Sequence, residues 1–282
     1  MRLLLTALVV LASAGCSRTE DHGAPQHPPA TPKRRVVPLV VPSDAQIPAG
    51  AQGDLIRRGR TLAMRTKEEL GDRIGADMHC SSCHLMGGTV AGAGPWIGLS
   101  GAYPLYRARA GRDTTLEDRV DECVERSLNG KPLAHDAPEM KAIVAYIDWL
   151  SKDVPKDADV EGRGFTRLER PVNVDPDVGQ TTYTVRCASC HGLDGQGKKN
   201  PEGGYLYPPL WGDRSFNIGA GMARLDTAAA FVYANMPFGA GKTLTVSEAY
   251  DATAYFTRQA RPDYAGKAGD WPKGGKPPDA RY

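Results

Sequence analysis

Residues 80–84 read CSSCH and residues 187–191 read CASCH, and these two pentapeptides decide the fold. Each holds a C-x-x-C pair followed directly by a histidine. In such a motif the two thiols add to the vinyl groups of a haem, and the adjacent imidazole becomes the proximal ligand of the iron. A disulfide or a thioredoxin-like redox pair would explain C-x-x-C, but not the histidine after both pairs. The sequence therefore predicts two covalently bound haem c groups, attached at Cys80, Cys83, Cys187 and Cys190 and ligated by His84 and His191.

The two motifs lie in an internal repeat. The pentapeptides match at an offset of 107 residues, and PEMKAIVAYIDWL from Pro138 matches SEAYDATAYFTRQ from Ser247 at an offset of 109. Self-similarity at one nearly fixed spacing indicates two copies of one domain. Each copy is interpreted as a mainly α, class I cytochrome c-like domain with an N-terminal, a middle and a closing helix. The segment SKDVPKDADVEGRG marks the linker, and the predicted domains span residues 47–158 and 159–282.

The N-terminal stretch indicates export. Residues 1–15, MRLLLTALVVLASAG, run from one arginine through an apolar stretch to small residues, as in a secretory signal peptide, and are too short to span a bilayer as a mature helix. Two processing routes stay open: cleavage by ordinary signal peptidase after ASA, or lipoprotein processing with a lipid anchor on Cys16. Residues 16–46 are rich in proline and are expected to form an extended tether. A periplasmic location follows.

Overall charge excludes one class of partner. The formal net charge is only +2 over 282 residues, which does not indicate nucleic-acid binding. Recognition of a charged ligand or partner must therefore depend on local clusters of charged residues.

The second copy contains a recognisable distal ligand. NMPFG, residues 235–239, lies between the haem motif and the closing helix and resembles the Met-Pro loop of class I cytochromes c. A thioether is a soft ligand that favours ferrous iron and raises the reduction potential. Met236 is therefore the predicted distal ligand of the second haem.

The first copy lacks this methionine. The repeat register places Ser127 opposite Met236, and Cys123 lies one helical turn earlier on the same face. Cys123 is accordingly the predicted distal ligand of the first haem. Met140 and His135 are rivals, but the first belongs to the closing helix and the second to a polar loop. A buried, inert cysteine is the remaining alternative.

The helix around Cys123 carries polar groups at helical spacing. Thr114 and Glu117 form a capping-box pattern, and Asn129 with Gly130 is a helix stop. Three residues then share one face: Arg119, Cys123 and Ser127. The preceding segment YPLYRARAGR adds Arg107, Arg109 and Arg112. Together these arginines would form an anion pocket over the haem and favour the thiolate of the cysteine.

With these motifs the chain resembles the dihaem thiosulfate dehydrogenases, also called tetrathionate synthases. The resemblance covers residues 54–260 and rests on both C-x-x-C-H motifs, DECVERSLNGK, YIDWLS, PPLWGDRSFNIGAGM and NMPFG. It implies that the active haem is ligated by His84 and Cys123 and the electron-transfer haem by His191 and Met236. The resemblance further implies that the substrate-binding residues are Arg109, Arg119 and Ser127. Some members have a lysine beside the methionine, where this chain has Asn235, so a Lys/Met ligand exchange is not expected.

The resemblance also implies a reaction. Two thiosulfates are joined through sulfur into tetrathionate, and the two electrons pass through the haems to an external acceptor such as a small cytochrome c. Cys123 would leave the iron, form a thiosulfonate with the first substrate and be displaced by the second, while Ser127 donates a hydrogen bond to a sulfonate oxygen. Three alternatives remain: a dihaem electron carrier without substrate chemistry, the same enzyme working as a tetrathionate reductase, and a dihaem peroxidase, for which no distal acid–base pattern is present.

Overall fold

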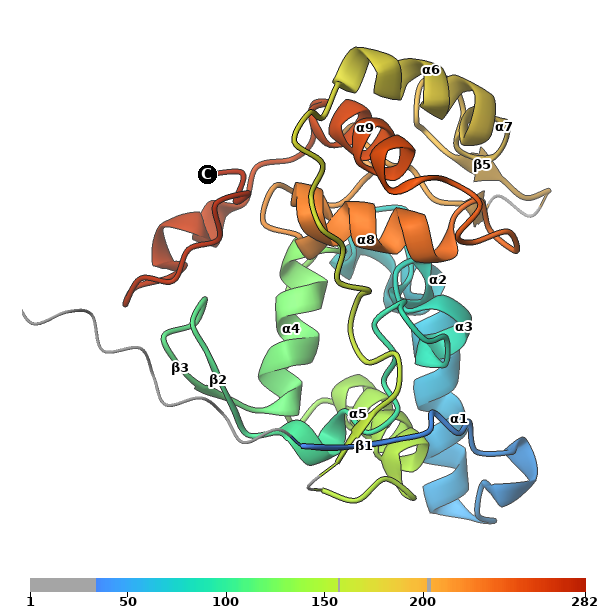
Figure 1. The fold of residues 1–282 in the computed structure, drawn as a ribbon. Helices are drawn as coiled ribbons and strands as arrows, with labels where there is room; N and C mark the ends of the chain where they lie inside the picture. Colours follow the sequence, from blue (N-terminus) through green and yellow to red (C-terminus); the bar gives the residue numbers. More distant parts are fainter. Residues whose placement is uncertain (1–33, 157, 202–203) are drawn as a thin grey trace, which may run out of the picture. The chain divides into compact units, whose positions relative to one another are not determined.

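The computed structural model describes residues 34–156, 158–201 and 204–282 (Figure 1). The predicted signal peptide and the predicted lipid-anchor residue Cys16 lie outside these residues. The α-helices are α1 Ala51–Met64, α2 Thr66–Leu70, α3 Leu85–Gly88, α4 Leu116–Arg126, α5 Pro138–Ser151, α6 Pro176–Arg186, α7 Ala188–His191, α8 Leu225–Asn235 and α9 Val246–Thr257. The strands are β1 Arg35–Val37, β2 Leu105–Arg107, β3 Arg112–Thr114, β4 Ala158–Val160, β5 Lys198–Lys199 and β6 Tyr205–Tyr207. The predicted mainly α fold is confirmed. None of the helices in the described residues has the length and apolarity needed to cross a membrane.

The internal repeat appears as two similar helix crossings. In the first copy α1 packs on the closing helix α5, and in the second α6 packs on the closing helix α9. A glycine stands at each crossing: a Cβ at Gly59 would come within 1.9 Å of the carbonyl oxygen of Ala142, and one at Gly179 within 1.9 Å of that of Asp251. Only glycine lets the two backbones approach this closely.

Gly59→Ala is therefore expected to destabilise the first domain. The added methyl group must push α1 away from α5, and overpacking of this kind lowers the free energy of unfolding by about 1–3 kcal/mol or more. The measurement is denaturant unfolding of the haem-loaded protein. Gly221→Ala is the matched control, because its new Cβ would meet only Thr227 Cγ2, at 3.9 Å. An equal loss of stability in both variants would show that the crossing is not the cause.

Helix α4 agrees with the sequence prediction at its end but not at its start. Asn129 has a positive φ of 46°, and the Gly130 amide donates to the Val124 carbonyl at 2.8 Å, which confirms the predicted stop. The capping box, however, is formed by Thr115 and Asp118 rather than by Thr114 and Glu117. The predicted pair was wrong by one residue because Thr114 is the last residue of β3, where its hydroxyl donates to the Leu105 carbonyl.

Part of the predicted tether is a strand. β1 pairs in parallel with β4, with Arg35 opposite Ala158 and Val37 opposite Val160, and Val37 and Leu39 pack against the hydrophobic core. β4 contains the predicted boundary between residues 158 and 159. Proline content could not reveal this pairing, because the partner strand lies in the linker between the two copies.

Candidate functional site

One cavity brings together the first haem motif and α4. Among its lining residues are Cys80, Cys83, His84, Arg119, Cys123 and Ser127. The structure thus joins the three residues predicted on one face of α4 with the three residues of the motif that are predicted to bind haem. Met140 is fully buried in α5 and does not line this cavity, and the side chain of His135 is 52% exposed in its loop. Neither rival of Cys123 lies in this cavity.

The histidine of each C-x-x-C-H motif is oriented by a backbone carbonyl. His84 Nδ1 lies 2.7 Å from the carbonyl oxygen of Gly94, and His191 Nδ1 lies 2.9 Å from that of Pro208. A carbonyl at Nδ1 fixes the tautomer and leaves Nε2 free to ligate a metal. The Gly94 amide in turn donates to the Gly164 carbonyl at 2.9 Å, so the linker after β4 supports the loop that orients His84.

The thiol of Cys123 differs from the four thiols of the motifs. Burial raises the pKa of Cys123, but the positive charge of Arg119 and the facing His84 imidazole lower it by more, and the pKa falls to about 7. Burial raises the pKa of Cys80 to about 11 and that of Cys83 to about 12. Cys123 is therefore the thiol of the first cavity that readily carries a negative charge.

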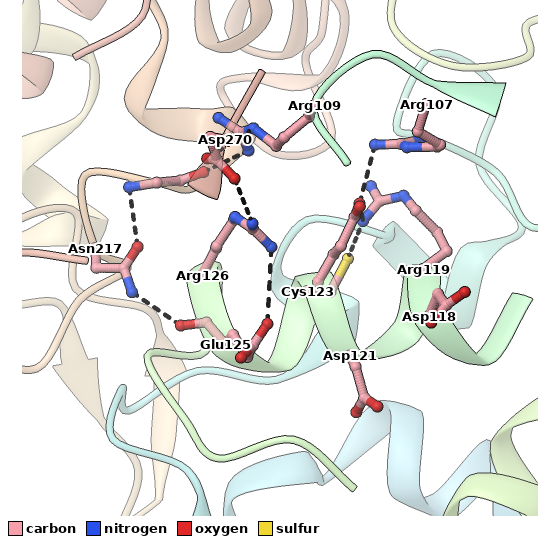
Figure 2. A network of polar contacts seen from close by, with 12 residues as sticks. Arg107, Arg109, Asp118, Arg119, Asp121, Cys123, Glu125, Arg126, Asn217 and Asp270 are labelled. Carbon is pink, nitrogen blue, oxygen red and sulfur yellow. Dashed lines mark hydrogen bonds and ion pairs between the residues drawn. The ribbon is translucent and has the colours of Figure 1, made fainter. Parts of the chain in front are cut away.

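Arg119, whose positive charge lowers the pKa of Cys123, contacts the sulfur directly. Its NH1 group donates to Cys123 Sγ at 2.9 Å. Glu122, whose side chain is 13% exposed, lies 3.6 Å from Arg119 and accepts from Arg107 at 3.0 Å. Figure 2 shows this chain of contacts above α4. The cluster contains two guanidinium groups, one carboxylate and the thiol of Cys123.

The other predicted arginines are placed differently. Arg112 forms two hydrogen bonds to Asp118, its side chain is 59% exposed, and it does not line the cavity. Arg109 does not line the cavity either, and its side chain points toward Asp270 (Figure 2). The predicted pocket of arginines is therefore only partly assembled around Cys123.

A second cavity holds the other haem motif. It is lined by Cys187, Cys190, His191 and Met236, together with apolar residues such as Phe231 and Phe256. Met236 follows the last residue of α8, so the helix end delivers its side chain to the cavity. Asn235 does not line this cavity, because its amide donates to the Phe231 and Gly92 carbonyls at 3.0 and 3.2 Å.

The two cavities adjoin each other. Met78, His79 and Cys83 line both. The two cavities therefore share part of their walls.

The donor sets fit haem c in both cavities. Each offers two thiols, an imidazole with Nδ1 already engaged, and a sulfur atom from another element of the domain. All five cysteines in the described residues are free of disulfides. Haem c needs this combination of two attachment thiols and two axial donors.

Sequence reasoning missed Arg163. It lines the first cavity from the loop after β4, and its guanidinium lies 2.7 Å from Asp159. In the sequence it stands in the predicted linker, and no local pattern distinguishes it from a solvated arginine.

Known proteins match both domains. Residues 72–155 match the family model "SoxA/TsdA, cytochrome c domain", and residues 177–273 match the "Cytochrome c" model. The chain is 44% identical over 238 residues to a thiosulfate dehydrogenase of Allochromatium vinosum, which covers 83% of this chain and 88% of the relative. It is 42% identical over 243 residues to a thiosulfate dehydrogenase of Psychrobacter arcticus, with coverages of 86% and 74%.

A solved protein structure is similar to the structure of this chain. The thiosulfate dehydrogenase (TsdBA) of Marichromatium purpuratum in its as-isolated form superposes with a TM-score of 0.76 at 36% identity. The alignment covers 80% of this chain and 50% of that one, so the chain spans about half of the solved protein. The predicted pair of tandem cytochrome c domains is confirmed, and haem c is the cofactor that such domains bind. With these two domains and these relatives, the chain belongs to the thiosulfate dehydrogenase family.

Proposed function

We propose that this chain oxidises two thiosulfate ions to tetrathionate at the first cavity and passes the two electrons through the second domain to an external redox protein. The observation that carries this proposal is the 2.9 Å contact between Arg119 and Cys123 in the cavity that also contains His84. It combines a nucleophilic sulfur with a cation that attracts a sulfonate.

Two haem c groups complete the enzyme. Cys80 and Cys83 would attach the first, and His84 and Cys123 would hold its iron. Cys187 and Cys190 would attach the second, and His191 and Met236 would hold its iron. When bound, each haem accepts one electron, so the pair takes up the two electrons that the reaction releases.

Arg119 addresses the electrostatic difficulty of the reaction. Two thiosulfate dianions about 4 Å apart repel each other by about 4 kcal/mol even at the dielectric constant of water. A guanidinium beside the reacting sulfur offsets this repulsion and binds sulfonate oxygens in a fixed geometry. Ser127, on the same face of α4, can donate a further hydrogen bond to a sulfonate oxygen.

Cys123 divides the reaction into two steps. Its thiolate forms an S–S bond with the outer sulfur of the first thiosulfate, giving a cysteine thiosulfonate and releasing two electrons. The outer sulfur of the second thiosulfate then attacks this S–S bond, which releases tetrathionate and restores the thiolate. A pKa of about 7 suits the sulfur both as nucleophile and as leaving group.

The adjoining cavities support the electron path. Cys83 belongs to the first haem motif and also lines the second cavity, so electrons can pass from one domain to the other over a short distance. The acceptor is proposed to be a small cytochrome c or another redox protein in the periplasm, to which residues 1–15 would direct export. Anchoring through Cys16 remains the alternative to a free enzyme.

The test is anaerobic mixing of the oxidised, haem-loaded protein with thiosulfate. We expect both haems to become reduced, with one tetrathionate formed for every two thiosulfates consumed, as measured by absorption spectroscopy and ion chromatography. A protein that exchanges electrons with other cytochromes but is not reduced by thiosulfate would be an electron carrier instead. Faster turnover with tetrathionate and a reductant would identify a tetrathionate reductase.

Met236→Ala is expected to separate the roles of the two domains. Loss of the soft sulfur ligand should lower the reduction potential of the second haem and slow electron transfer to the acceptor. The KM for thiosulfate should stay close to that of the wild type, because Met236 lines only the second cavity. Potentiometric titration and steady-state kinetics measure the two effects. Loss of thiosulfate binding at an unchanged potential would reverse the assignment of the domains.

A further inference from the structure

The C-terminal tail, residues 258–282, lies beyond the closing helix α9 and returns to the first domain. The Trp271 amide donates to the carbonyl of Arg109 at 2.8 Å, and a Cβ at Gly111 would come within 2.6 Å of Pro272. Arg109 and Gly111 belong to the turn between β2 and β3. The tail of the second domain therefore packs directly on the hairpin that precedes α4.

Asp270 is the ionic centre of this contact. Its side chain is only 4% exposed, and its two carboxylate oxygens contact different arginines of the first domain. Oδ2 lies 3.2 Å from Arg109 Nε, and Oδ1 accepts from Arg126 NH2 at 2.8 Å. The Tyr282 hydroxyl donates to the same carboxylate. A buried carboxylate that bridges two side chains restricts both to one rotamer.

Aromatic rings cover the faces of the two guanidinium groups. Trp271 lies 4.5 Å from the guanidinium carbon of Arg109, and Tyr264 lies 4.5 Å from that of Arg126. Arg109 NH1 also donates to the Gly219 carbonyl at 2.8 Å. All of these contacts of the Arg109 side chain are made with the second domain, although the residue itself belongs to the first.

The cluster pairs two guanidinium groups with two carboxylates. Besides Asp270, which contacts both arginines, Glu125 lies 3.8 Å from Arg126 NH1 (Figure 2). Arg126 Nε and NH1 are buried and have no hydrogen-bond partner within the described residues. Arg126 belongs to α4 and immediately precedes Ser127, which lines the cavity of Cys123. The guanidinium groups of Arg109 and Arg126 are therefore held in place, close to one end of the substrate cavity, by residues remote in sequence.

We infer that the tail is part of the thiosulfate site, with Asp270 and Trp271 as positioning residues for Arg109. This inference rests on the proposed function. On its own, the long side chain of Arg109 would sample many rotamers on a short hairpin turn, and each anion bound would have to order it. The tail orders it in advance, so that its charge contributes to capture of the dianion.

The main variant is Trp271→Ala, with Trp271→Phe as the conservative partner that retains a ring over Arg109. Asp270→Asn is the second variant, because it removes the charge and keeps the shape. The matched control is Asp263→Asn, an equal change in the same tail at an exposed residue that pairs with Lys267. Haem content and absorption spectra confirm that each protein is folded and loaded.

Two readouts are needed. The first is labelling of Arg109 by phenylglyoxal, followed by peptide mass spectrometry, which reports the position of the side chain independently of activity. The second is steady-state kinetics with thiosulfate. For Trp271→Ala and Asp270→Asn we expect faster labelling of Arg109 and a KM raised about three- to tenfold at nearly unchanged kcat, in line with the usual strength of cation–π contacts. Trp271→Phe and Asp263→Asn should behave like the wild type.

Other results overturn the inference. Unchanged labelling means that the tail does not position Arg109. Faster labelling with an unchanged KM means that Arg109 takes no part in capture, and a lowered KM means that Asp270 competes with the substrate. A wild-type protein that thiosulfate cannot reduce would instead contradict the proposed function, and the labelling result would still report whether the tail holds Arg109.

Discussion

Cys123→Ala should leave both haems attached and the fold intact, yet lower the rate of thiosulfate oxidation by about 100-fold or more, as expected when a covalent nucleophile is removed. The variant removes only the sulfur, because alanine is the best helix former and α4 can keep its conformation. Without the sulfur the substrate has no atom with which to form the thiosulfonate. The first haem would also lose its distal ligand, which should change its low-spin spectrum in the oxidised state.

Oxidised-state electron paramagnetic resonance and steady-state kinetics together decide this prediction. Glu117→Ala, in the first turn of the same helix, is the control for an effect on α4 itself. If Cys123→Ala keeps both the low-spin signal of the first haem and most of the activity, Cys123 is an inert buried cysteine and the enzymatic proposal fails.

Arg119→Ala should have the second largest effect, a fall in kcat/KM of about tenfold to a hundredfold, because a hydrogen bond to a charged group contributes roughly 1.5–3 kcal/mol. The variant removes the donor that lies 2.9 Å from Cys123 Sγ. It also removes the charge that lowers the pKa of that thiol, so a smaller fraction of Cys123 is thiolate at neutral pH. Both changes weaken the capture and the activation of thiosulfate.

Arg112→Ala is the control for a general loss of positive charge. Arg112 lies on the neighbouring strand and pairs with Asp118 at the start of the same helix, but it lies outside the cavity. Its kcat/KM should stay within a factor of two or so of the wild type, since exposed ion pairs contribute little. Similar losses in both variants would mean that long-range attraction, rather than the contact with Cys123, explains the role of Arg119.

The sequence alone was sufficient for the features that depend on local spacing. Two C-x-x-C-H motifs specify attachment chemistry within five residues, and the repeat that contains them specifies two similar helical domains. The position of Arg119 beside Cys123 was predictable, because a side chain four residues earlier in a helix lies one turn away on the same face. The structure places these groups together with a contact of 2.9 Å.

The start of α4 shows a limit even of local patterns. Thr114 and Thr115 are equally good capping residues, and Glu117 and Asp118 are both acidic. The choice between the pairs is made by β3, which engages the hydroxyl of Thr114 and leaves Thr115 to cap the helix. That strand exists only because β2 pairs with it.

What the sequence by itself determined is the pair of cytochrome c domains, their mainly helical fold and the helix face that carries Cys123. Only the tertiary structure decided which arginines reach that face. It placed Arg163 in the cavity from the linker, left Arg112 on the surface, and turned Arg109 toward Asp270. The reason is physical: helix periodicity relates residues within a few turns, whereas the side chain of Arg109 is held by a carboxylate and an aromatic ring from the far end of the chain, and no local pattern encodes that approach.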